Sequence, residues 1–76
     1  MELSNQEKKF LLERTQRQIM AQIYDQTISA QIAKRIGNDK NMEQLQKSLE
    51  TLEKTKREYD AEIATIDKVI ESETKT

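Results

Sequence analysis

The chain of 76 residues contains no cysteine, histidine, proline or tryptophan, and only one glycine. Without cysteine there are no disulfides and no thiolate metal sites. Without histidine the chain lacks the commonest general base and the commonest metal ligand. A single glycine is too few for a glycine-rich loop that cradles phosphate. These absences predict a protein without enzymatic activity, cofactor or bound metal.

The balance of charge and hydropathy narrows the class of partner. Charged residues make up 36% of the chain and hydrophobic residues 34%, and the net charge is −1. Such a net charge provides no overall attraction to nucleic acid or to an anionic membrane. No hydrophobic run approaches the ~18 residues of a membrane span, and MELSNQEKKF lacks the order of a signal peptide. We therefore expect a cytoplasmic protein that makes no membrane contact.

One strong interruption, RIGNDKN at residues 35–41, divides an otherwise helix-forming sequence. Gly37 followed by Asn38 suits the left-handed end of a helix, and Asn38, Asp39 or Asn41 would each cap the next helix. The sequence therefore predicts a single domain over 1–76, with helices at about 5–36 and 41–72, a turn at 37–40 and a frayed tail at 73–76.

Local side-chain patterns support both predicted helices. Ser4 with Glu7, and Asn41 with Gln44, have the spacing of a capping box. Oppositely charged residues four apart predict ion pairs on the second helix, each contributing only ~0.2–0.5 kcal/mol. These pairs are Glu43 with Lys47, Glu50 with Lys54, and Glu53 with Arg57.

Heptad patterns on the two helices match each other. The second helix alternates spacings of three and four at Met42, Leu45, Leu49, Leu52, Lys56, Tyr59, Ile63, Ile66 and Ile70. The first helix has a corresponding series at Leu12, Gln16, Ile19, Ile23, Gln26, Ala30 and Ala33. Such repeats imply supercoiling of one helix on another, and folding back at the turn sets small residues against large ones. The predicted fold class is all-α, an antiparallel two-helix hairpin resembling a coiled coil.

Lys56 occupies a heptad position where an apolar residue is expected, and it faces Ile23 in the predicted pairing. Its stem would cover apolar surface while the ammonium group reaches water, and its charge would discourage slipped registers. A second interpretation makes Lys56 a functional charge in a larger core. That interpretation requires a buried carboxylate partner, which the sequence does not identify, so both stay open here.

The first helix carries a second apolar face about 160° from the first, counted at 100° per residue. Phe10, Ala21, Tyr24, Ile28 and Ile32 form this face, and Met20 lies on the arc between the two faces. Contiguous exposed apolar patches usually mark contact sites. We predict that two copies pair through this face, giving a homodimeric four-helix assembly with the second helix outside. A helix from another protein would use the same face, and scattered hydrophobes on a monomer are the third interpretation.

The predicted function is that of a non-enzymatic protein-binding and oligomerisation module: a small adaptor, inhibitor or assembly factor. The usage of lysine, glutamine and isoleucine is typical of AT-rich bacteria and their phages. An alternative is a dimeric module that binds structured RNA. It would use the basic start of the first helix, where positive charge is concentrated at Lys8, Lys9, Arg14 and Arg17. Acidic residues interspersed among these disfavour a phosphate-binding face.

Overall fold

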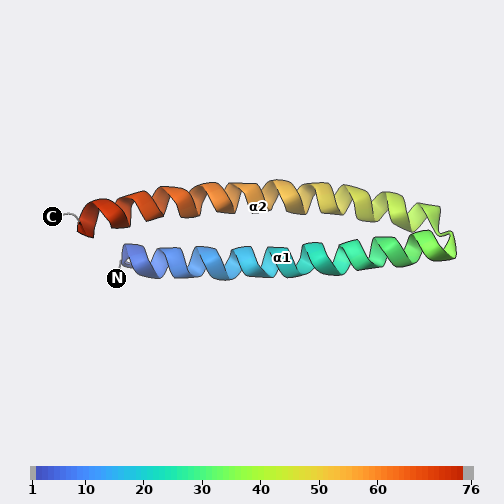
Figure 1. Ribbon diagram of the computed structural model, residues 1–76, viewed down its shortest axis with the longest axis horizontal. Helices are drawn as coiled ribbons and strands as arrows, with labels where there is room; N and C mark the ends of the chain where they lie inside the picture. Colours follow the sequence, from blue (N-terminus) through green and yellow to red (C-terminus); the bar gives the residue numbers. More distant parts are fainter. Residues whose placement is uncertain (1, 75–76) are drawn as a thin grey trace.

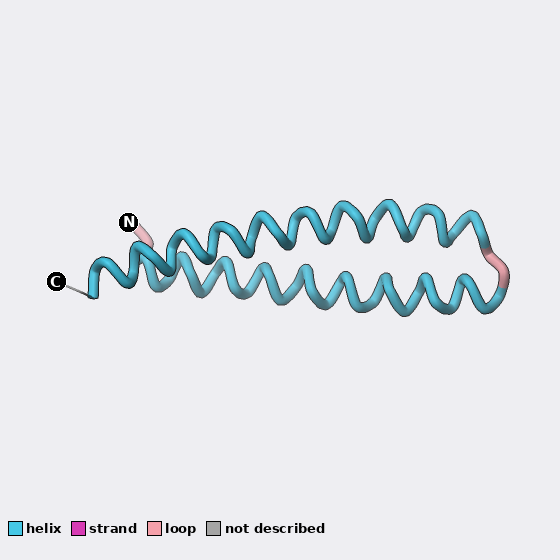
Figure 2. The backbone as a smooth tube through the Cα atoms, turned by 45° about the horizontal axis from the view of Figure 1, so that its top comes forward, coloured by secondary structure: helices cyan, strands magenta, loops and turns pink. Residues whose placement is uncertain are grey.

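Two long helices make up the computed structural model, which describes residues 2–74. Helix α1 spans Asn5–Ile36 and helix α2 spans Asp39–Thr74. The helices run antiparallel and side by side along their whole length, joined by one tight turn (Figures 1 and 2). The predicted all-α hairpin is therefore confirmed, and the molecule is a rod measuring 59 × 19 × 17 Å.

The start of α1 is closed by the predicted capping box. The backbone N–H of Glu7 donates to Ser4 Oγ at 3.1 Å, and the Ser4 N–H donates to Glu7 Oε1 at 3.0 Å. Two N–H groups near the free end of the helix thus gain partners. The hydrogen bonds from Ser4, led by that from its backbone N–H, lower the pKa of Glu7 below its usual value.

The turn consists of only two residues, Gly37 and Asn38. Gly37 adopts the left-handed conformation with φ 74°, which costs glycine little because it has no Cβ. Asn38 Oδ1 then accepts from the N–H of Asn41 at 3.2 Å, so Asn38 caps α2. The predicted turn at 37–40 is thus too long, because Asp39 and Lys40 are already helical. Asn41, predicted as a possible cap, lies inside the helix.

The far end of α2 also differs from the prediction. Residues 73 and 74, predicted to fray, belong to the helix, while 75 and 76 lie outside the described residues. The Thr74 hydroxyl donates to the backbone carbonyls of Ile70 and Glu71. Across the hairpin, Asn5 Nδ2 donates to Glu73 Oε1. The helix extends because these contacts hold its last turn.

The predicted heptad series form the seam between the helices. Every heptad residue of α2 is half-buried, and the α1 series is half-buried or buried. Leu12, Tyr59 and Ile66 line one groove between the helices, and Ile23 and Lys56 line another. The structure therefore brings Ile23 and Lys56 into one groove, as their predicted pairing requires.

The core that this seam creates is thin. Among the described residues only Ile19 and Ala33 are buried, at 7% and 1% exposure. The chain exposes 6199 Å², whereas a compact monomer of this mass would expose about 4,800 Å². Its radius of gyration is 17.2 Å, against about 11 Å for a compact domain of this length. The hairpin alone therefore leaves an unusually large surface in water.

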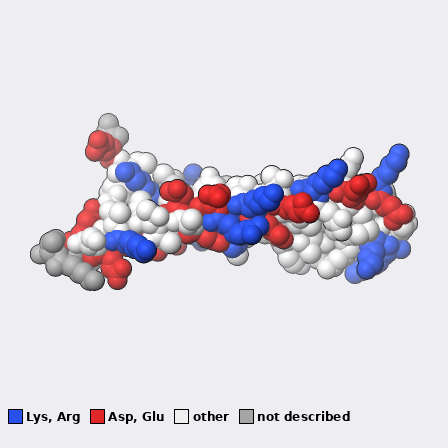
Figure 3. Space-filling model, turned by 90° about the horizontal axis from the view of Figure 1, so that it is seen from above, with Lys and Arg blue, Asp and Glu red and all other residues white. Residues whose placement is uncertain are grey.

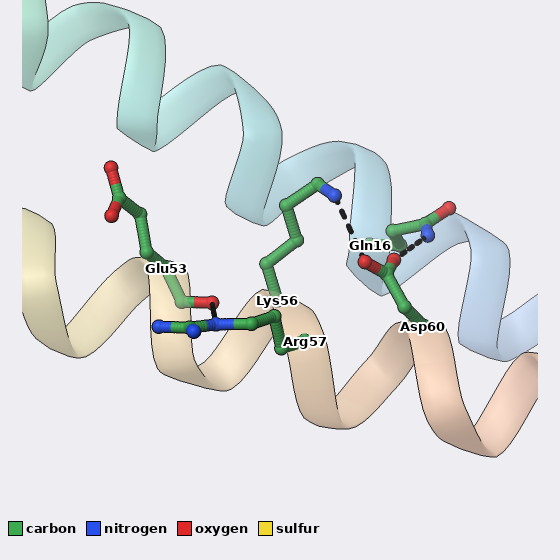
Figure 4. A network of polar contacts seen from close by, with 5 residues as sticks. All are labelled: Gln16, Glu53, Lys56, Arg57 and Asp60. Carbon is green, nitrogen blue, oxygen red and sulfur yellow. Dashed lines mark hydrogen bonds and ion pairs between the residues drawn. The ribbon is translucent and has the colours of Figure 1, made fainter.

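Two polar features of the hairpin add nothing to its stability. Gln26 occupies a seam position, and its Oε1 atom is buried without a hydrogen-bond partner among the described residues. A buried acceptor left unsatisfied is destabilising. The prediction of three ion pairs on α2 is wrong, because none of these pairs comes within ion-pair distance in the described part of the chain. Arg57 Nε, for example, donates to the backbone carbonyl of Glu53 at 3.5 Å (Figure 4).

Candidate protein-binding surface

A stripe of apolar side chains lies along α1 on the face turned away from the seam. We call the predicted set the outer stripe: Phe10, Met20, Ala21, Tyr24, Ile28 and Ile32. Tyr24 and Phe10 are 67% and 59% exposed, and Met20 and Ile32 are each 48% exposed. Ala21 is also exposed, whereas Ile28 is half-buried. The outer stripe is thus solvent-accessible along most of its length, because α2 covers only the opposite face of α1.

Two shallow hollows extend the outer stripe sideways and along the helix. Met20 and Tyr24 share one hollow with Ile23, Thr27 and Lys56, which carries the apolar surface from α1 towards α2. Near the start of α1, Phe10 and Leu11 line another hollow together with Leu3, which is itself 47% exposed. These hollows provide places into which a partner's side chains can insert.

Arg14 and Arg17, predicted only as nucleic-acid contacts, lie on the same face as the outer stripe. Phe10, Arg14, Arg17 and Ala21 line one hollow. Counted along α1, Phe10, Arg14, Arg17, Ala21, Tyr24 and Ile28 alternate spacings of four and three, and we call this series the outer heptad. The spacing in the sequence is the signal that would have revealed it. The outer heptad is therefore a mixed apolar and cationic series with the repeat of a helix–helix contact.

The four basic residues proposed for nucleic-acid contact are not gathered into one patch. Lys9 Nζ forms an ion pair with Asp67 Oδ1 of α2 at 2.6 Å, and this hydrogen bond raises the pKa of Lys9. Lys8 lines the groove between the helices, whereas Arg14 and Arg17 lie on the outer face. On the side of the molecule where α2 lies, Lys and Arg are interspersed with Asp and Glu (Figure 3).

A polar network crosses the seam at Lys56. Lys56 Nζ donates to Asp60 Oδ2 at 3.0 Å, and Gln16 Nε2 of α1 donates to the other carboxylate oxygen (Figure 4). These two hydrogen bonds, with that from Lys56 the larger cause, lower the pKa of Asp60. The side chains of Lys56 and Asp60 are 33% and 40% exposed. The carboxylate partner of Lys56 is therefore exposed in part, which favours a role in the seam over a charge in a larger core.

Replacing Lys56 with leucine is expected to stabilise the hairpin by about 1 kcal/mol, because an exposed ion pair contributes little and a buried leucine contributes more. Urea denaturation followed by circular dichroism at 222 nm measures the change. Lys54→Leu, on the exposed face of α2, serves as the matched control and should bring no gain. A loss of stability in Lys56→Leu would show that the network of Lys56, Asp60 and Gln16 outweighs apolar packing.

No metal-binding cluster accompanies this surface in the part of the chain that the structure describes. No three carboxylates among residues 2–74 lie together in a way that would hold a metal ion. Neither helix in that range is long and apolar enough to cross a membrane.

Comparison with known proteins identifies no relative of this chain. No family model, curated protein or solved structure matches the chain. The chemistry of the outer stripe itself must therefore indicate the function.

Proposed function

We propose that this chain is a non-enzymatic protein-binding module that associates with itself through the outer stripe of α1. The dimer would be a four-helix assembly with the two α1 helices in the middle and the α2 helices outside. The observation that carries this proposal is the exposure of large apolar side chains along one helix face, with Phe10 and Tyr24 more than half exposed. Large exposed apolar side chains gathered on one helix face usually mark a contact surface.

The thin core supplies the energetic reason for association. A single small core rarely provides more than ~3–5 kcal/mol of stability. The surface exposed beyond that of a compact domain is about 1,400 Å², whereas a standard interface buries about 800 Å² per partner. The excess exposed surface of the whole chain is therefore larger than one side of a standard interface, and pairing through α1 would stabilise the hairpin by mass action.

The two helices would then have different roles. Helix α1 has two apolar faces: the first contacts α2, and the second would contact the partner. Helix α2 presents one half-buried heptad to α1 and a charged face to water. We infer that α2 braces α1 and keeps the assembly soluble, while the surface left free on the dimer is available to further protein partners. An adaptor, an inhibitor or an assembly factor would each work in this way.

Light scattering after size exclusion, over a hundredfold range of protein concentration, tests this proposal. A mass of twice 8.9 kDa that persists on dilution, or that appears as the concentration rises, is the expected result. A monomer at every concentration would contradict self-association. In that case the outer stripe would be a site for a helix of another protein.

A further inference from the structure

The outer heptad points to a helix as the partner and constrains how that helix lies. Spacings of four and three are the repeat of a seam in which two helices run nearly parallel or antiparallel to each other. Building on the proposed self-association, we propose that two copies of α1 pair antiparallel, about a twofold axis near residue 19. Each Arg14 would then lie on the Tyr24 and Asp25 of the other copy.

The positive charges of Arg14 and Arg17 disfavour a parallel pairing of the two α1 helices. In a parallel, in-register pair, each heptad residue faces its own counterpart, so Arg14 would face the partner's Arg14 and Arg17 the partner's Arg17. Both arginines are exposed on the outer face and form no ion pair among the described residues. Bringing four unpaired guanidinium groups together in a seam is strongly unfavourable.

An antiparallel pair centred near residue 19 gives every member of the outer heptad a suitable neighbour. Phe10 lies opposite the partner's Ile28, which joins two apolar side chains at each end. Arg17 lies opposite the partner's Ala21, where a small side chain leaves room for the long one. The two Arg17 residues are offset by four residues, or about 6 Å along the axis, so they do not face each other as they would in a parallel pair. The two Met20 side chains meet beside the axis, which accounts for an exposed methionine at that position.

Arg14 has the most specific neighbours in this arrangement. It lies opposite the partner's Tyr24, whose ring is 67% exposed in the single chain and offers a face for a guanidinium group. Asp25 of the partner is the next residue, is exposed, and forms no ion pair among the described residues. An unpaired cation thus meets an aromatic ring and an unpaired carboxylate, twice in each dimer.

Neighbouring registers are less favourable. A shift of one heptad in one direction sets Arg14 opposite the partner's Arg17, so that like charges meet. A shift in the other direction sets Arg14 opposite the partner's Gln31 and Arg17 opposite the partner's Ile28. Neither arginine then faces Tyr24 or lies beside Asp25, and the start of each α1 is left without a partner. The register centred near residue 19 overlaps almost the whole of both α1 helices, which span Asn5–Ile36.

Distances between spin labels test the arrangement directly, because the chain has no cysteine and one can be introduced at will. Ser29 is exposed and lies off the outer stripe, so Ser29→Cys carries a nitroxide without touching the interface. In the proposed dimer the two labels lie about 20 residues apart along the axis, or about 30 Å. Double electron–electron resonance is expected to show a separation of about 30–40 Å once the distance across the helices is included.

A second label at Gln22→Cys serves as the reference. Its two copies lie about 9 Å apart along the axis, so its separation should stay below about 25 Å. A short distance at both positions would overturn the antiparallel arrangement, and a long distance at both would overturn the register. If light scattering shows only monomer, the proposed self-association fails and this inference fails with it. A dimer with the wrong distances overturns this inference alone.

Arg14→Gln provides an independent test whose sign differs between the arrangements. In the antiparallel dimer the variant loses its contact with the partner's Tyr24 and Asp25, and the dissociation constant is expected to rise about tenfold. In a parallel dimer it removes a repulsion, and the dissociation constant would fall. Lys8→Gln, which removes a positive charge outside the outer heptad, is the control and should leave the dissociation constant unchanged.

Discussion

Ile28→Glu is expected to convert the dimer into a monomer without unfolding the hairpin. Ile28 is half-buried in the single chain, and a partner helix on the outer stripe would bury the remainder. Loss of this contact, and the cost of placing a carboxylate in the interface, amount to about 2–4 kcal/mol for each copy. Because each dimer contains two such sites, its dissociation constant should rise about a thousandfold or more.

Light scattering and circular dichroism together measure this result. The mass of Ile28→Glu should remain that of a monomer at concentrations where the original chain is dimeric, while its helical signal at 222 nm persists. Ser29→Glu places the same charge one residue away, on an exposed position outside the outer stripe, and should still form the dimer. If Ile28→Glu keeps the dimeric mass, the outer stripe is not the interface.

Ile19→Ala, unlike Ile28→Glu, is expected to lose the helical signal at 222 nm, because the hairpin itself unfolds. Ile19 is the one large side chain that is buried among the described residues, at 7% exposure. Truncating a buried isoleucine to alanine costs about 2–5 kcal/mol, through lost burial and the cavity that remains. A single small core supplies only ~3–5 kcal/mol, so the variant should be largely unfolded at low concentration.

Urea denaturation of Ile19→Ala, compared with the original chain at the same protein concentration, checks this prediction. Ile36→Ala removes the same atoms from a side chain that is 71% exposed, and it should change the denaturation midpoint little. A dimer would add stability by mass action, so both variants are best compared at the lowest measurable concentration. Equal midpoints for the two variants would show that the seam does not hold the hairpin together.

Much of the fold was predictable because it depends on local chemistry. The Ser4–Glu7 capping box and the left-handed Gly37 are short-range features, and both are present in the structure. The turn was placed correctly but made too long, because three residues could cap α2 and only the structure shows that Asn38 does so. The position of a cap depends on the path of the chain between the helices, which sequence patterns describe only within a few residues.

The partners of charged side chains were predicted less well. Lys9 was assigned to a possible nucleic-acid surface, and the structure pairs it with Asp67 on the other helix. Lys56 and Asp60 are four residues apart, so their ion pair could have been recognised in the sequence. Long flexible side chains choose among several neighbours at similar free energy, and residue spacing alone does not decide between them.

The sequence by itself determined the helices, the seam and the existence of a second apolar face, because each follows from residue spacing along a helix of known pitch. Only the tertiary structure decided which side chains of α1 are covered by α2, and how much of each remains exposed. It showed that Tyr24 and Phe10 are more than half exposed while Ile28 is half-buried. It also joined Gln16 to Asp60 across the seam. The reason is that burial and contacts between helices depend on how the two helices pack, and a pattern within one helix cannot specify them.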